Sequence, residues 1–173
     1  APLNITASHQ WTAGYDSIQI GVFVANAGSA TVASGAAGSL KLHVAVIEEE
    51  VNYPSAPGSN GETTFYQVMR KMVPDASGTT MVDSWTSGQT QMFVFKVAAP
   101  SYLANLNKVA VVAFIQDNSN KSVLNASRTT ATTIAGLPDI GVNAFTAATP
   151  GLCNGTTTPM VTIKNEGSLA ITS

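Results

Sequence analysis

The sequence predicts a mostly β fold: an antiparallel β-sandwich, Ig-like or jelly-roll-like, with one short helix. Three observations predict this class. Apolar residues recur at every second position in several short runs, stretches containing Gly, Pro and Asn separate these runs, and a single segment has helical spacing. Two antiparallel sheets can each bury one face against the other, whereas a parallel α/β fold would need several helices.

The first half of the chain contains three alternating runs. Leu3–Trp11 and Ile18–Val24 each place apolar residues on one parity, and Gly14 lies in the break between them. The alternation returns at Leu40–Val46, after the stretch NAGSATVASGAAGS, which has the composition of a loop. We therefore predict two strands joined by a tight turn and a third strand after a longer loop.

One segment breaks this period. In NGETTFYQVMRKMVP, the apolar residues Phe65, Val68, Met69 and Met72 have the spacing i, i+3, i+4, i+7 of one helix face. A threonine before them can cap the helix, and Pro74 can end it. We predict a short helix here, with a further strand as the alternative.

The later strands include one that is apolar on both parities. Met92–Val97 alternates again, but Val109–Ile115 is apolar throughout. Because a strand needs two apolar sides when both of its faces are covered, Val109–Ile115 is predicted to lie in the middle of a packed sheet. A polar cluster and a weaker apolar run follow, which indicates a turn and a returning strand.

Prolines mark the end of the predicted sandwich. Pro138 and Pro150 flank a short stretch, after which another strand-like run begins. We predict a β-sandwich domain over residues 1–135, a linker over 136–150, and the first strand or strands of a truncated following module over 151–173. An isolated strand is unstable, so this tail either stays mobile or, if it is ordered, adds to a sheet edge in the same or a neighbouring chain. Addition to a neighbouring chain would give a route to homo-assembly.

Composition limits the function classes. Only 10% of the residues are charged and the net charge is −2, so nucleic acid and anionic membrane surfaces are not expected partners. The apolar runs are far shorter than the roughly 20 residues of a spanning helix, so no transmembrane segment is predicted. Low charge, abundant Ser, Thr, Ala and Gly and a single cysteine, Cys153, are more typical of an extracellular β-protein than of a cytosolic enzyme.

Two polar clusters are candidate sites. Asp117, Asn118 and Asn120 could begin a calcium loop, but the glycine and terminal glutamate of an EF-hand are missing, so a turn is favoured. The second cluster, Glu48–Glu50 with His43 on the same predicted strand, suggests a metal or acid–base site. His43 and Glu49 would be about 20 Å apart on a straight strand, so a solvated strand end is favoured.

We predict no catalytic residue, cofactor or metal site. No nucleophile motif or phosphate-binding loop accompanies the two histidines or the glycine-rich stretch. The candidate ligand-binding residues are Tyr53, Tyr66, Trp85 and Tyr102. If these aromatic residues cluster on an exposed face, they favour glycan or peptide binding, whereas their burial favours a structural spacer.

Three stretches resemble the Bacteroidetes outer-membrane-protein-twenty-eight-like family. They are LKLHVAVIEEEVNY, FYQVMRKMVPDASGTTM and VVAFIQDNSNKSVLNA, within residues 40–128. The resemblance implies a β-sandwich that follows a thioredoxin-like domain, in a protein that is secreted or associated with the outer membrane and cell surface. The tail from Gly151 is similar to the start of an adhesion-related Ig-like module. This chain has no Cys-x-x-Cys, so the family's redox chemistry does not carry over to it.

The sequence also contains one candidate modification site. The tripeptide Asp16-Ser17-Ile18 resembles the acceptor pattern of Bacteroidetes protein O-glycosylation, which marks Ser17 as the candidate residue, although three residues recur easily by chance.

The predicted function follows from these features. We expect a non-catalytic, secreted or cell-surface β-sandwich module that acts as a structural spacer or interaction domain of a larger Bacteroidetes protein. Its partners would be the flanking domains of the same polypeptide and other copies that join by strand exchange. The alternative is a module that binds a glycan or peptide through its loop aromatics.

Overall fold

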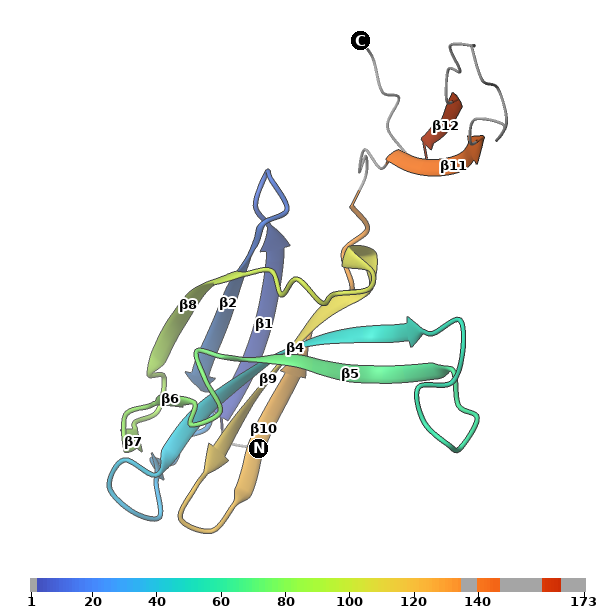
Figure 1. Cartoon of the computed structure of the whole chain (residues 1–173). Helices are drawn as coiled ribbons and strands as arrows, with labels where there is room; N and C mark the ends of the chain where they lie inside the picture. The colour runs from blue at the N-terminus through green and yellow to red at the C-terminus, as the bar shows by residue number, and fades with distance from the viewer. Residues whose placement is uncertain (1–2, 135–139, 147–159, 166–173) are drawn as a thin grey trace, which may run out of the picture. The chain divides into compact units, whose positions relative to one another are not determined.

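The structure is a computed structural model that describes residues 3–134, 140–146 and 160–165 (Figure 1). Its elements, in chain order, are β1 (Leu3–Trp11), β2 (Ser17–Asn26), β3 (Val32–Ala33), β4 (Leu40–Asn52), β5 (Thr64–Val73), β6 (Thr79–Thr80), β7 (Ser84–Trp85), β8 (Thr90–Ala98), the 3-10 turn η1 (Leu106–Lys108), β9 (Val109–Asp117), β10 (Ser122–Arg128), β11 (Ile140–Thr146) and β12 (Met160–Asn165). Residues 1–132 and 133–173 form two separate units.

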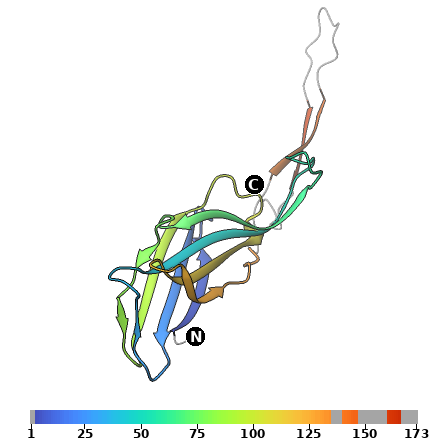
Figure 2. The same ribbon diagram turned by 90° about the horizontal axis from the view of Figure 1, so that it is seen from below.

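The first unit is a sandwich of two antiparallel sheets (Figures 1 and 2). One sheet has the order β1-β2-β8, and the other has the order β10-β9-β4-β5, with β6 paired to the start of β4. The short pair β3–β7 forms a small separate sheet. The predicted mostly β, antiparallel sandwich is confirmed.

The interior is built by alternate residues of the long strands. Between the sheets lie Ile18, Ile20, Val22 and Val24 of β2, Leu42, Val44 and Val46 of β4, and Val109, Val111, Ala113 and Ile115 of β9, each at most 1% exposed. β9 lies between β10 and β4, so the predicted internal position of Val109–Ile115 is confirmed.

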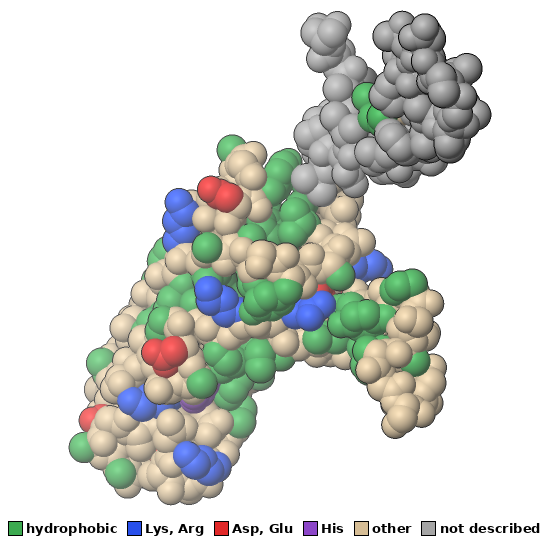
Figure 3. Space-filling model, viewed as in Figure 1, with side chains coloured by type: hydrophobic (Ala, Val, Ile, Leu, Met, Phe, Trp, Pro, Cys, Tyr) green, Lys and Arg blue, Asp and Glu red, His purple; other side chains and the backbone are tan. Residues whose placement is uncertain are grey.

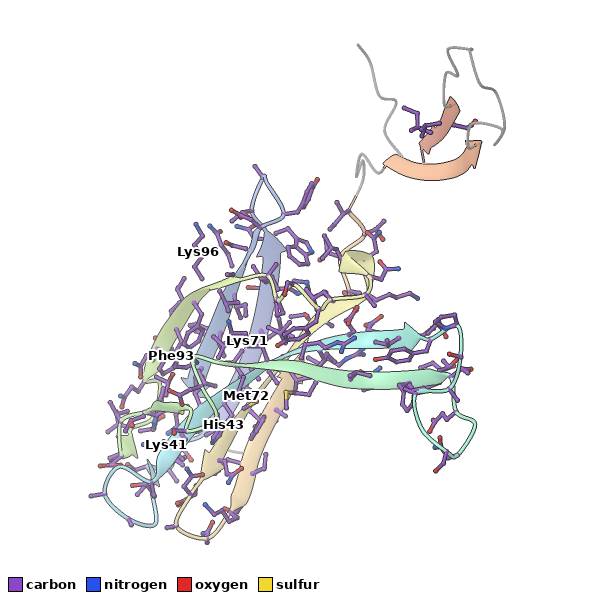
Figure 4. The ribbon with its side chains drawn as sticks, viewed as in Figure 1. Lys41, His43, Lys71, Met72, Phe93 and Lys96 are labelled. Atoms are coloured by element: carbon purple, nitrogen blue, oxygen red, sulfur yellow. The ribbon has the colours of Figure 1, made fainter. Side chains whose placement is uncertain are left out.

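The central strands β4 and β9 are also covered on their outer face. Ala45, Ile47 and Ala110 form a second buried cluster there, against which Met72 and Val112 pack. Figure 4 labels His43 and Met72, which come from β4 and β5 on this side of the sheet. The apolar residues on the second parity of Val109–Ile115 therefore belong to this outer cluster and not to the sandwich interior.

The helix predicted around Phe65–Met72 is wrong, because these residues lie in strand β5. β5 pairs with β4, and a bulge between Val46 and Ile47 shifts their register. Met69 pairs with Ile47 on one side of the bulge, and Met72 pairs with Ala45 on the other. Since a bulge changes the phase of the side-chain alternation, Met69 and Met72 lie on the same face of β5 although they are three residues apart, which is a helical spacing.

The second unit contains one described hairpin. β11 and β12 pair antiparallel, with Val161 opposite Phe145 and Ile163 opposite Val142. Val161 is 50% exposed and Ile163 is 64% exposed. The described part of the tail thus pairs within its own chain, and residues 140–146 of the predicted linker form a strand. The predicted domain boundaries themselves stay a prediction.

Among the described residues, no helix has the length and apolar character needed to cross a membrane.

Candidate functional site

The polar cluster after β9 forms the turn to β10. Asp117 is 5% exposed, and its carboxylate accepts hydrogen bonds from the Gly35 N–H at 2.6 Å, the Ser119 N–H at 2.9 Å and the Ser119 hydroxyl at 2.7 Å. Hydrogen bonds from the Ser119 and Ser39 hydroxyls and from both N–H groups hold the pKa of Asp117 far below its ordinary value. The predicted turn is confirmed, and its carboxylate connects two loops.

Glu48 has a role that the sequence did not reveal. Its side chain is fully buried, so the predicted solvated strand end is wrong for this residue. One carboxylate oxygen accepts hydrogen bonds from the Ala104 N–H at 2.8 Å and the Asn105 N–H at 2.7 Å, and the other pairs with the Arg70 guanidinium. The hydroxyl of Tyr102 donates to the Arg70 carbonyl at 2.7 Å. This Glu48 cluster joins β4, β5 and the connection between β8 and β9.

The other two glutamates are more exposed. Glu49 pairs with Arg128 of β10 at 2.6 Å, and Glu50 lies 4.0 Å from Lys108. The side chains of Glu49 and Glu50 are 27% and 35% exposed, which agrees with the solvated strand end predicted for them. Glu48 differs because it is the last β4 residue that pairs with β9, opposite Val109, whereas Glu50, on the same face of β4, lies beyond the start of β9.

His43 lies toward the other end of β4. Its ring stacks on Phe114 with centroids 5.0 Å apart, and Gly78 lies against it, since a Cβ there would be 2.9 Å from the ring. Burial lowers the pKa of His43. The charged groups that affect its titration are Lys121 and Lys41, both cations, and not the glutamates. The described residues contain no group of three His, Cys, Asp or Glu side chains that could hold a metal ion.

The four candidate aromatics do not form one cluster. Trp85 is completely buried, and its indole N–H donates to the Val82 carbonyl at 3.1 Å, so it belongs to the core. Tyr102 packs at the Glu48 cluster, with its ring centroid 6.0 Å from the Arg70 guanidinium. Tyr53 and Tyr66 are 41% and 68% exposed and lie on the arm that β4 and β5 form beyond the other strands (Figure 1).

The arm carries a small apolar hollow that sequence reasoning missed. Tyr53, Pro57, Phe65 and Val68 line a volume of about 250 Å³, and the rings of Tyr53 and Phe65 meet edge to face at 5.8 Å. A helix assignment for Phe65 and Val68 hid this arrangement. The signal that could have revealed it is the Pro57–Gly61 turn sequence before an aromatic run, which is typical of a hairpin.

Ser17 begins β2 and is 9% exposed. Its hydroxyl and that of Thr12 donate to the Asp16 carboxylate, and these two hydrogen bonds lower the pKa of Asp16. In the folded domain the predicted O-glycosylation residue is therefore both buried and hydrogen-bonded. Modification of Ser17 stays a prediction, and it would require access before the sandwich closes.

Comparison with known proteins decides the family. A family model described as outer membrane protein Omp28 matches residues 2–133. The chain belongs to this Omp28 family. Membership agrees with the outer-membrane or cell-surface location indicated by the sequence, and the predicted family is confirmed. No curated protein matches the chain.

Two solved structures share the fold of this Omp28-family chain. One is a domain of the outer membrane lipoprotein Omp28 from Porphyromonas gingivalis, with 17% identity and a TM-score of 0.50 over 75% of this chain and 95% of that one. The other is HBP35 of the same organism, with 13% identity and a TM-score of 0.53 over 98% of this chain. The match covers 57% of the HBP35 chain, so the same architecture occurs there as part of a longer protein.

Proposed function

We propose that this Omp28-family domain is a non-catalytic module that acts as a structural spacer or interaction domain of a larger outer-membrane or cell-surface protein. The observation that carries the proposal is the use of the buried carboxylates. Glu48 and Asp117 are saturated by main-chain N–H groups, hydroxyls and Arg70, so both hold loops on the sandwich instead of facing a cavity. Carboxylates that serve in acid–base catalysis need access to a substrate.

The flanking domains are part of this proposal. A thioredoxin-like domain before the chain and an Ig-like module that starts at its end are implied by the family resemblance. Exchange of the tail strand between copies also stays a proposal. Because β12 already pairs with β11 on one side, a second copy would have to pair at its other side. The sequence of the full-length gene product would test both expected neighbours.

A domain replacement tests the spacer role. In the parent protein, residues 1–132 would be exchanged for an unrelated β-sandwich of similar length, and surface display of the flanking domains would be measured. A spacer tolerates the exchange, whereas an interaction domain loses its partner. Turnover of ester, glycoside or phosphate substrates by the isolated chain, abolished by Glu50→Gln, would contradict the non-catalytic proposal.

The arm hollow favours glycan or peptide binding as a second candidate. Aromatic faces that are exposed beside an apolar hollow provide the stacking surface used for such ligands. NMR titration with oligosaccharides and with extended peptides would test it. We expect shifts at the arm that disappear in Tyr53→Ala, which removes an exposed ring that lines the hollow. Val123→Ala, at an apolar residue of β10 that is 54% exposed, should leave binding unchanged.

A further inference from the structure

The sandwich has four sheet edges, which differ in how far their main-chain hydrogen-bonding groups are occupied. β1 and β10 are edge strands of opposite sheets. The Ser127 hydroxyl of β10 accepts from the Ala7 N–H of β1 at 3.1 Å, and the Asn125 side chain donates to the Leu3 carbonyl at 2.7 Å. These side chains occupy main-chain groups of the β1 edge, so this corner is closed to a further strand.

The β5 edge is irregular. Gln67 has a positive φ of 54°, and a register shift lies between β5 and β4. The Tyr102 hydroxyl also occupies the Arg70 carbonyl at 2.7 Å. A strand that twists and carries an occupied carbonyl offers a poor template for pairing.

The β8 edge is regular and open. β8 pairs with β2 from Thr90 to Ala98 without a register shift, and it lies at the end of the sheet order (Figure 1). The Asn26 N–H donates to Gln89, and the Ala99 N–H donates to Asp16. Because bonded pairs alternate along an antiparallel ladder, odd-numbered residues of β8 bond to β2, and the N–H and C=O groups of the even-numbered residues point outward.

The outer face beside this edge is apolar. Val94 is 75% exposed, Met92 is 59% exposed, and Phe23 of the neighbouring strand is 41% exposed. Phe23 lies opposite Met92, and Gly21 lies opposite Val94. The missing side chain at Gly21 leaves a hollow of about 270 Å³ that Val94 lines together with Ser8 and Gln19.

We infer that β8 is a self-association edge, at which a second copy of this chain adds its own β8 antiparallel across a two-fold axis. The register that pairs all of Thr90–Ala98 with itself is centred on Val94, which is 75% exposed. In this register the outward-pointing groups of both copies meet, because even-numbered residues face even-numbered residues. The two sheets would then join into one continuous sheet.

The position of the charged residue in β8 is compatible with a second copy of the chain as the partner. Lys96 is the only charged residue of β8, and in Figure 4 it extends away from the strand. In the register centred on Val94, Lys96 lies opposite Met92 of the second copy, so like charges do not oppose each other and the lysine stem covers the methionine. One strand pair makes a small interface, below about 1,200 Å², so we expect a concentration-dependent equilibrium between monomer and dimer.

Sedimentation of the full chain tests the association. We expect the mass to rise from monomer toward dimer with increasing concentration. Val94→Lys places like charges opposite each other and should keep the chain monomeric, whereas Thr6→Lys, at an exposed position on the far strand of the same sheet, should not. A wild-type chain that remains monomeric up to about 1 mM, the range in which even weak complexes form, overturns the inference.

Disulfide trapping tests the register. In a Cys153→Ser background, Val94→Cys should form a linked dimer rapidly, because residues opposite each other have Cα atoms about 5.5 Å apart. Met92→Cys and Lys96→Cys should each link poorly alone, about 13 Å from their own copies, but should link to each other when mixed. Trapping of Val94→Cys that is no faster than that of Thr6→Cys overturns the inference. This result would leave the spacer proposal untouched, since a spacer can be monomeric.

Discussion

Replacement of Glu48 by alanine tests whether the Glu48 cluster holds the arm and the β8–β9 connection on the sandwich. The variant removes the acceptor for the Ala104 and Asn105 N–H groups and leaves the Arg70 guanidinium, only 13% exposed, without its partner. Breaking a buried ion pair by removing one partner costs about 3–5 kcal/mol, because the other charge stays buried and uncompensated. We expect a loss of free energy of unfolding in this range.

Glu49 supplies a matched control on the same strand. Its ion pair with Arg128 has a similar short distance of 2.6 Å, but the two side chains are 27% and 43% exposed. Exposed pairs contribute about 1 kcal/mol or less, so Glu49→Ala should be nearly neutral. The double variant Glu48→Met with Arg70→Met should recover part of the loss, because the uncompensated charge is gone while two N–H groups still lack an acceptor.

Urea unfolding at neutral pH, followed by the fluorescence of the buried Trp85 and the partly buried Trp11, provides the assay. The variants should change the transition midpoint and leave its slope unchanged. If Glu48→Ala costs no more than Glu49→Ala, the Glu48 cluster does not stabilise the fold and the reasoning fails.

Three further predictions use the same assay. Because the folded-state pKa of Asp117 lies below its unfolded value, its stabilisation is present above an unfolded pKa of about 4 and is lost as the pH falls below it; Asp117→Asn should therefore show less loss of stability in acid than the wild type. Val111→Asp should unfold the domain, whereas Val112→Asp on the outer face, beside Arg128, should fold; equal effects would contradict the assigned faces. A chelator should leave the melting temperature unchanged, and a drop of about 10 °C would indicate a structural metal.

The strands could be predicted where alternation is regular. The runs of β1, β2, β4, β8 and β9 each have apolar residues on the parity that faces the sandwich interior. The central strands β4 and β9 also have them on the parity that faces the outer cluster. The two-residue strands β3, β6 and β7 are too short to show a period, so the sequence gives no signal for them. β5 was assigned to a helix because its bulge shifts the phase of the apolar residues.

The site was harder to predict because its partners are distant in the sequence. The turn at Asp117 was predictable, since Asp and Ser bond to main-chain groups nearby. Glu48 receives its donors from residues 22, 56 and 57 positions away, which only the sheet pairing brings together. Alternation also leaves open which parity of a two-sided strand faces the interior, so Val111 and Val112 could not be distinguished before β4 was paired with β9.

The two buried carboxylates lie at opposite ends of one ladder. β4 and β9 pair from Leu40 opposite Asp117 to Glu48 opposite Val109, and the inward side chains between these ends are apolar. A slip of β4 by one residue would turn its interior side chains outward and take Glu48 away from the Ala104 and Asn105 N–H groups. A slip by two would keep the parity. In one direction it would place the apolar Val46 at these donors. In the other it would place Glu50 there, which keeps an acceptor but shifts β4 and the preceding Gly35 away from the Asp117 carboxylate. Apolar burial alone therefore fixes the face of β4, and the carboxylate at each end fixes its position along the strand.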